Sequence, residues 1–294
     1  MIENIPNIPK EKRSLLEKLV GQLSQITGMA AIVLGGSHAS GTQHETSDLD
    51  IGLYYFEANP FSIADVRRIA DENSVQGPAT VTGFYEWGAW VNGGAWIRTP
   101  HGKVDFLYRN LDQVRQTIAE AHQGISHHDY DQQPTYGFYS VIYLAETRIC
   151  IPLYDPEMLI TELKHRVETY PPKLKQKVVA DSLWMAEFTI LHARGFAAQG
   201  DIYNTVGCLT RVVTCVTQAL FALNERYFIG DKRVLEMVAR FPNLPSGYIQ
   251  QINHILACPG STAQELAKTV SDLEQALYCV VLLPGVNYEP KFRI

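Results

Sequence analysis

The fold of this chain is decided by residues 30–53, which read AAIVLGGSHASGTQHETSDLDIGL. A short apolar run ends in Gly35-Gly36-Ser37, and a second apolar segment further on carries Asp48 and Asp50 in alternation with apolar residues. Residues two apart in an extended strand point to the same face, so the two aspartates project together. Neighbouring carboxylates repel one another unless a cation lies between them. Because oxygen-only ligands favour Mg²⁺ or Mn²⁺, this segment predicts a divalent-cation site.

The glycine-serine step predicts an anion site beside that cation. Gly35 and Gly36 permit backbone conformations that a Cβ would forbid, and they let a ligand approach the chain closely. If the next segment opens a helix, its free N–H groups and the Ser37 hydroxyl can bind phosphate. Phosphate on one side and a metal-bearing strand on the other predict a nucleoside triphosphate site.

These residues resemble the nucleotidyltransferase domain of the DNA polymerase β superfamily, and within it the small-molecule, aminoglycoside-type nucleotidyltransferases. The shared signature is an apolar strand, then Gly-Ser, then a gap of about ten residues, and then Asp-apolar-Asp-apolar. The resemblance covers roughly the first half of the chain. It implies a third carboxylate on a later strand, and the apolar segment 102–108 (GKVDFLY) supplies Asp105.

The resemblance also implies roles for individual residues. Catalysis and metal binding fall to Asp48, Asp50 and Asp105, which would hold Mg²⁺ or Mn²⁺. Binding of the triphosphate falls to Gly36, Ser37, His38 and Lys232. His38 stands where look-alike sequences often carry arginine, and a neutral histidine donates a hydrogen bond but lacks the permanent charge. Lys232 would reach the triphosphate from the helical half, and a solvated surface lysine is the equally weighted alternative.

The predicted architecture is α/β (α+β), a small mixed-sheet nucleotidyltransferase domain over 1–156 followed by an all-α helical bundle over 157–294. Apolar periodicity predicts the helices. They are 10–27, 62–73 and 110–124 in the first domain, and 173–199, 202–226, 232–240, 247–257 and 261–282 in the second. Asn92-Gly93 between apolar segments predicts a β-hairpin, and 147–154 a last strand.

Several residues near these elements have two interpretations. The clustered Trp87, Trp90 and Trp96 are typical of core packing, and the alternative is that one stacks on a base or substrate. Glu86 is an extra ligand or base, or a solvated turn residue. Glu187 is a buried base or lies at the polar edge of its helix. The candidates for a general base are Asp105, Glu86 and Glu187, in that order.

Composition excludes some function classes. The chain has 294 residues and a net charge of −6, which argues against a broad nucleic-acid-binding surface. Its five cysteines form no Cys-x-x-Cys pair, and the first residues carry no apolar signal-peptide core, so a cytoplasmic protein is predicted without a membrane span. The polar stretch at His127 and His128 reads as an exposed loop in preference to a metal site.

The function predicted from these features is metal-dependent transfer of a nucleoside monophosphate, AMP from ATP, onto a hydroxyl of a small molecule. Nucleic acid and membrane are not expected as partners, and a homodimer is left open. One alternative is adenylylation of a protein partner. Another is a nucleotide-binding protein that does not catalyse, which the presence of all three carboxylates disfavours.

Overall fold

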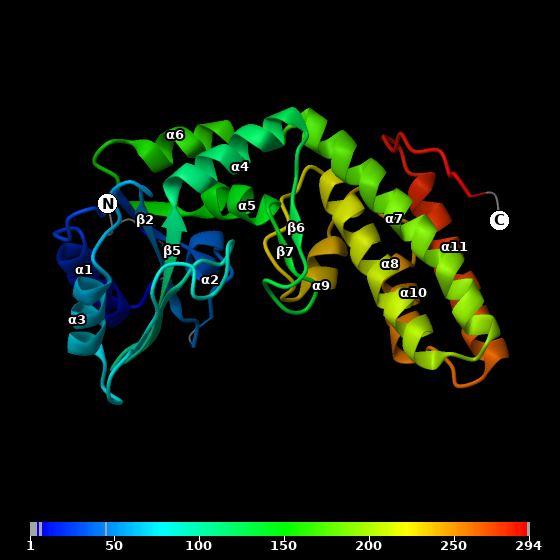
Figure 1. Ribbon diagram of the computed structural model, residues 1–294, viewed down its shortest axis with the longest axis horizontal. Helices are drawn as coiled ribbons and strands as arrows, with labels where there is room; N and C mark the ends of the chain where they lie inside the picture. Colours follow the sequence, from blue (N-terminus) through cyan, green and yellow to red (C-terminus); the bar gives the residue numbers. More distant parts are fainter. Residues whose placement is uncertain (1–4, 6–7, 45, 293–294) are drawn as a thin grey trace. The chain divides into compact units, whose positions relative to one another are not determined.

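The computed structural model describes residues 5, 8–44 and 46–292. Contacts divide the chain into two compact units. The first comprises Met1–Glu120 with His127–Thr169, and the second comprises Ala121–Ser126 with Tyr170–Ile294. The first unit contains the sheet, and the second is helical (Figure 1).

A six-stranded mixed sheet in the order β3-β4-β5-β2-β1-β8 is the framework of the first unit. Its strands are β1 (Ala31–Leu34), β2 (Leu49–Tyr55), β3 (Thr80–Val81), β4 (Gly94–Thr99), β5 (Gly102–Asn110) and β8 (Ile151–Tyr154). The central pair β2 and β5 is parallel, and every other pair in this sheet is antiparallel. A separate two-stranded ribbon joins β6 (His128–Asp129) and β7 (Phe138–Tyr139).

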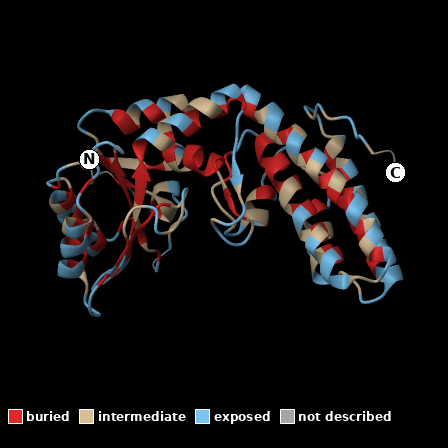
Figure 2. Cartoon of the chain, viewed as in Figure 1, coloured by how far each residue is buried: buried red, intermediate tan, exposed pale blue. Residues whose placement is uncertain are grey.

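One face of the sheet is fully covered by α1 (Lys10–Leu23) and α3 (Ile63–Asn73), which lie on the same side of it in Figure 1. Alternate strand residues such as Ile51 and Phe106 point into this core, which is drawn red in Figure 2. The helix α3 begins as the sequence predicts, because the Ser62 side chain accepts a hydrogen bond from the Asp65 N–H at 3.2 Å.

The opposite face of the sheet is covered only in part. The helix α5 (Val141–Ile149) packs near the end of β5. There the buried Arg109 forms a bidentate ion pair with Glu146, with nitrogen–oxygen distances of 2.8 and 2.7 Å. The guanidinium also lies over the Tyr143 ring, 5.6 Å from its centroid. The other end of this face carries half-buried and exposed side chains, including those of Asp50, Asp105 and Trp96. We call this uncovered part, formed by β2, β5 and β4, the open face.

The second unit is built on two long helices, α7 (Pro172–Ala198) and α8 (Ile202–Leu223), which pack along each other. The shorter α10 (Tyr248–Ala257) contacts α8, while α11 (Ala263–Val281) packs on α7 and begins with a capping box of Thr262 and Glu265. The remaining helices in the described residues are α2 (Gly36–Ser40), α4 (Leu111–Gln123), α6 (Leu159–Arg166) and α9 (Val234–Val238). By length and composition α8 alone among the described helices could cross a membrane, yet 61% of its apolar window is buried inside the protein.

The predicted fold class is confirmed, one predicted strand is wrong, and another begins later than predicted. Residues 84–92 form turns where a hairpin strand was expected, because side chains take the backbone hydrogen bonds: Tyr85 N–H donates to Asn92 Oδ1, and Trp90 N–H to Gln132 Oε1. The predicted strand 147–154 is strand only from Ile151, since its first residues complete α5.

Candidate active site

The predicted carboxylates Asp50 and Asp105 are direct neighbours on the parallel strands β2 and β5, where they are register partners. Adjacent strands lie about 4.8 Å apart, so the two side chains share the open face at short range. Both residues are half-buried, as is Asp48, which immediately precedes β2. The fold therefore brings Asp105 beside Asp50 although 55 residues separate them in the sequence.

The glycine turn lies directly against Asp50. Gly35 N–H donates to the Asp50 carbonyl at 2.8 Å, which holds the end of β1 to β2. Gly36 has a φ of +57°, and a Cβ built on it would lie 1.8 Å from Asp50 Oδ2. Only glycine fits between the turn and this carboxylate, so the glycine predicted to admit a ligand also admits the Asp50 side chain.

His38 lies within α2 and is 3% exposed. Within the described part of the chain, neither of its ring nitrogens has a hydrogen-bond partner. Burial lowers the pKa of the imidazole, and the nearby Lys12 charge lowers it further. The backbone at Ser47 raises this pKa but does not reverse the net lowering. The ring is therefore a neutral, buried group, and its contact with phosphate stays a prediction.

Sequence reasoning missed Lys12, which supports the segment that carries Asp48. This lysine is only 8% exposed, and its Nζ donates to the Ser47 carbonyl at 2.6 Å. Its Cε also lies close to Gly102, where β5 begins. A sequence signal was present: Lys12 precedes Leu15 and Leu16 by three and four residues, which places it on the apolar side of α1.

The three clustered tryptophans separate into two environments. Trp96 is the register partner of Asp105 across β4 and β5, is 55% exposed, and stacks on Trp87 at 4.9 Å between centroids. Trp90 instead stacks on Phe138, 5.6 Å away, within an aromatic cluster. Core packing therefore describes Trp90, while Trp96 presents an indole beside a candidate catalytic carboxylate.

The other candidate bases have structural hydrogen bonds. Glu86 is exposed, and its carboxylate accepts from Gly83 N–H at 2.7 Å, as expected of a turn residue. In the second unit Glu187 is 6% exposed and accepts from the N–H groups of Lys291 and Phe292 at 3.0 and 2.7 Å, and from the Tyr288 hydroxyl. Glu187 thus ties the C-terminal segment to α7 and does not lie at a polar edge.

The remaining predicted site residues are placed as follows. Ser37 is half-buried in the first turn of α2, beside Gly36. Lys232 is exposed and precedes α9 in the second unit, so its role toward the triphosphate stays a prediction. The loop histidines make local contacts: His127 pairs with Glu120 at 2.9 Å, and His128 stacks on Tyr139.

The donor set suits Mg²⁺ in a specific way. Among the residues that the structure describes, no three His, Cys, Asp or Glu side chains converge into a ready-made metal site. What the fold provides is the Asp50–Asp105 pair, held against a glycine that leaves space for one of the carboxylates. Mg²⁺ is commonly bound by one or two carboxylates together with substrate phosphates and water, so these residues fit the ion when a nucleotide supplies the other oxygens.

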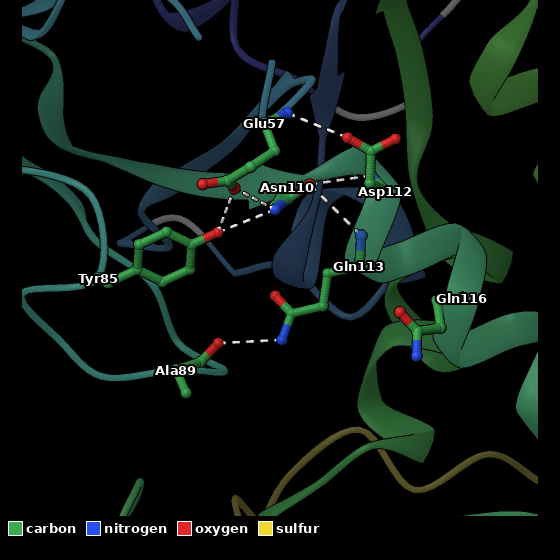
Figure 3. A pocket seen from close by; sticks show the side chains of 7 residues that line it. All are labelled: Glu57, Tyr85, Ala89, Asn110, Asp112, Gln113 and Gln116. Carbon is green, nitrogen blue, oxygen red and sulfur yellow. Dashed lines mark hydrogen bonds between the residues drawn. The ribbon is translucent and has the colours of Figure 1, made fainter. Parts of the chain in front are cut away.

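A separate pocket of about 560 Å³ lies at the C-terminal ends of β2 and β5 (Figure 3). Its polar groups satisfy one another: the Glu57 carboxylate accepts from the Tyr85 hydroxyl at 2.6 Å and from the Asn110 amide at 2.5 Å. Burial and the Glu57 carboxylate raise the pKa of the Tyr85 phenol, which keeps it a neutral donor. Asn110 lies five residues along β5 from Asp105, roughly 16 Å away, so this pocket is distinct from the carboxylate pair.

Two segments of the chain match known family models. Residues 16–79, which include the glycine turn, Asp48 and Asp50, match the family model of the nucleotidyltransferase domain, and residues 143–232 match a domain of unknown function (DUF4037). No curated protein matches the sequence. Among solved structures, a nucleotidyltransferase-like protein from Exiguobacterium sibiricum is 10% identical, with a TM-score of 0.46 over 92% of this chain and 74% of that one. The chain carries a nucleotidyltransferase domain of the DNA polymerase β superfamily.

Proposed function

We propose that this protein transfers a nucleoside monophosphate, AMP from ATP, onto a hydroxyl group of a small molecule in a metal-dependent reaction. The domain assignment supports nucleotidyl transfer as the class of reaction. The observation that carries the proposal is the direct pairing of Asp50 with Asp105 beside the Gly36 turn. A degenerate domain would have no need to keep two repelling carboxylates next to one another.

Each residue of the site has a distinct part in this reaction. Asp50 and Asp105, with Asp48 from the adjoining loop, would hold Mg²⁺, which supplies charge neutralisation at the phosphates and lowers the pKa of the acceptor hydroxyl. The Gly36-Ser37 turn would position the β- and γ-phosphates. Asp105 lies farther from this turn than Asp50 does, because β5 follows β2 in the sheet, and it would accept the proton of the attacking hydroxyl. Catalysis would come mainly from positioning and electrostatics.

The charge and composition of the chain support a small-molecule acceptor in the cytoplasm. The net charge of −6 gives no general attraction to nucleic acid. The five cysteines are free thiols in the structure, which accords with a reducing compartment.

The direct test is a transfer assay with ATP labelled at the α-phosphate, Mg²⁺, and a cell extract divided by size into small molecules and proteins. We expect label in a small-molecule product, lost with EDTA and lost in Asp105→Asn. The matched control is Asp65→Asn, an exposed carboxylate on α3 in the same unit. Label in a protein would overturn the acceptor class, and no metal-dependent label in either fraction would overturn the proposed activity.

A further inference from the structure

Two cations lie on the open face next to Asp105. Arg98 on β4 and Lys103 on β5 are register partners, directly beside the Trp96–Asp105 pair. Since residues two apart share a face, Arg98 and Lys103 point to the same side as Trp96 and Asp105. Successive rows of the open face therefore read Asp50, Asp105, Trp96 and then Lys103, Arg98.

These two cations have no structural explanation. Both residues are exposed, and within the described ranges neither side chain forms an ion pair or a hydrogen bond. Like charges directly opposite on a sheet destabilise it, so folding alone does not favour the pair. Two adjacent positive charges that form no ion pair within the described ranges are suited to a negatively charged ligand.

Trp96 adds a flat apolar surface beside these two cations. We call Trp96, Arg98 and Lys103 together the patch. Its indole stacks on Trp87, with 24° between the ring planes, and Trp87 in turn lies against Gly94, where a Cβ would meet its ring at 2.8 Å. This support holds the Trp96 ring in place while leaving it 55% exposed. A fixed, exposed indole is a stacking platform for another ring.

The order of the strands decides which substrate meets this platform. The glycine turn lies against Asp50, Asp105 is on the next strand, and Trp96 is one strand further in the same direction. In an in-line displacement the attacking and leaving oxygens are on opposite sides of the phosphorus. If pyrophosphate leaves toward the glycine turn, the attacking hydroxyl comes from the side of Trp96.

We propose that the acceptor is a hydroxyl compound with a planar ring and an anionic group. Its ring stacks on Trp96, its anion pairs with Arg98 and Lys103, and its hydroxyl lies at Asp105. This inference rests on the proposed function. The acceptor oxygen forms a bond to the α-phosphorus, the bond from that phosphorus to the pyrophosphate oxygen breaks, and the hydroxyl proton passes to Asp105. A polycationic acceptor of the aminoglycoside kind would be repelled by the same two cations.

The test uses phenyl phosphate, a flat ring bearing an anion, as the probe of the full-length protein. Binding is measured by saturation-transfer NMR, with benzyltrimethylammonium as the cationic counterpart and inorganic phosphate as the anion without a ring. We expect phenyl phosphate to bind best, and Trp96→Ala or the double variant Arg98→Gln/Lys103→Gln to weaken it about tenfold. All three side chains are exposed, so the variants should fold.

Matched controls separate the patch from general effects of charge and aromatic loss. Trp184→Ala removes another exposed, stacked tryptophan, and Lys10→Gln/Lys173→Gln removes two exposed lysines from elsewhere. Both controls should bind phenyl phosphate like the parent. Equal binding by the patch variants and the parent, or stronger binding of benzyltrimethylammonium, would overturn the inference.

A parallel titration with a non-hydrolysable ATP analogue and Mg²⁺ distinguishes this inference from the proposed function. We expect Trp96→Ala to bind the analogue normally. We expect Asp50→Asn to lose binding of the analogue while it still binds phenyl phosphate. Loss of analogue binding in Trp96→Ala would assign the indole to the donor base and overturn the acceptor assignment alone. No analogue binding by the parent would overturn the proposed function, whatever phenyl phosphate does.

Discussion

The substitution Gly36→Ala tests the close contact between the glycine turn and Asp50. The new Cβ would lie 1.8 Å from Asp50 Oδ2, 2.6 Å from its Cγ and 3.0 Å from its Cβ. Alanine at a φ of +57° costs about 1–2 kcal/mol. Relieving the overlap costs a further ~1–3 kcal/mol, so we expect a total loss of about 2–5 kcal/mol of unfolding free energy.

Two other glycines of the same segment provide matched controls. Gly41 also has a positive φ, +72°, but its added Cβ would meet nothing within 4 Å, so Gly41→Ala should cost only the backbone term of about 1–2 kcal/mol. A Cβ added at Gly35 would lie 3.7 Å from the nearest atom, the Asp50 carbonyl oxygen, which is an ordinary contact distance. The difference between Gly36→Ala and Gly41→Ala therefore isolates the contact with Asp50.

The assay is urea unfolding followed by tryptophan fluorescence in a Trp184→Phe background. Because Trp87, Trp90 and Trp96 all belong to the first unit, the signal then reports that unit alone. Binding of Mg²⁺ with a non-hydrolysable ATP analogue is measured in parallel, and displacement of Asp50 should weaken it about 10–100-fold.

A double-mutant cycle with Asp50→Ala completes this test. Removing the carboxylate takes away the two shortest contacts, so the cost of Gly36→Ala should fall by about 1–2 kcal/mol in that background. Equal costs for Gly36→Ala and Gly41→Ala, with unchanged nucleotide binding, would refute the assigned contact between the turn and Asp50.

Three further predictions concern buried polar groups of the first unit. Lys12→Met leaves the Ser47 carbonyl without its buried donor, and we expect a loss of about 1–3 kcal/mol in urea unfolding together with weaker nucleotide binding; unchanged stability would contradict the support role of this lysine. The pKa of His38 is lower in the folded protein than its usual 6.5, so the unfolded chain binds the proton more readily and stability should fall as pH drops below about 6.5. His38→Gln should flatten that pH dependence, and an identical slope would exclude His38 as its source. Arg109→Met leaves Glu146 without its partner beneath α5 and should cost about 3–5 kcal/mol by thermal or urea unfolding, whereas a loss below 1 kcal/mol would show that the pair adds little.

Local signals explain which parts of the fold the sequence predicts well. The Ser62 cap, the long helices α7 and α8, and the short helix after the glycine turn each follow from neighbouring residues. The adjacency of Asp50 and Asp105 was accessible only through the family resemblance, because parallel pairing across 55 residues has no local signal. Once the strands are paired, the register of β2 with β5 and of β5 with β4 determines which side chains share the open face.

The failures have long-range causes. The Asn92-Gly93 hairpin does not form because Gln132, 42 residues from Trp90, accepts a backbone hydrogen bond that a strand partner would otherwise take. Burial of Glu187 depends on a C-terminal segment 101 or more residues away. The exposure of Trp96 depends on α5 covering only part of that side of the sheet, which no local pattern of apolar residues reports.

The most direct test of Asp50 and Asp105 as the nucleotidyl-transfer site is calorimetric titration of the parent protein and of Asp50→Asn and Asp105→Asn with a non-hydrolysable ATP analogue, with and without Mg²⁺. We expect metal-dependent binding by the parent and its loss in both variants, with the fold retained because like charges opposite one another on a sheet do not stabilise it. Equal binding by the parent and both variants, or binding that is indifferent to Mg²⁺, would contradict the assignment of this carboxylate pair as the nucleotidyl-transfer site.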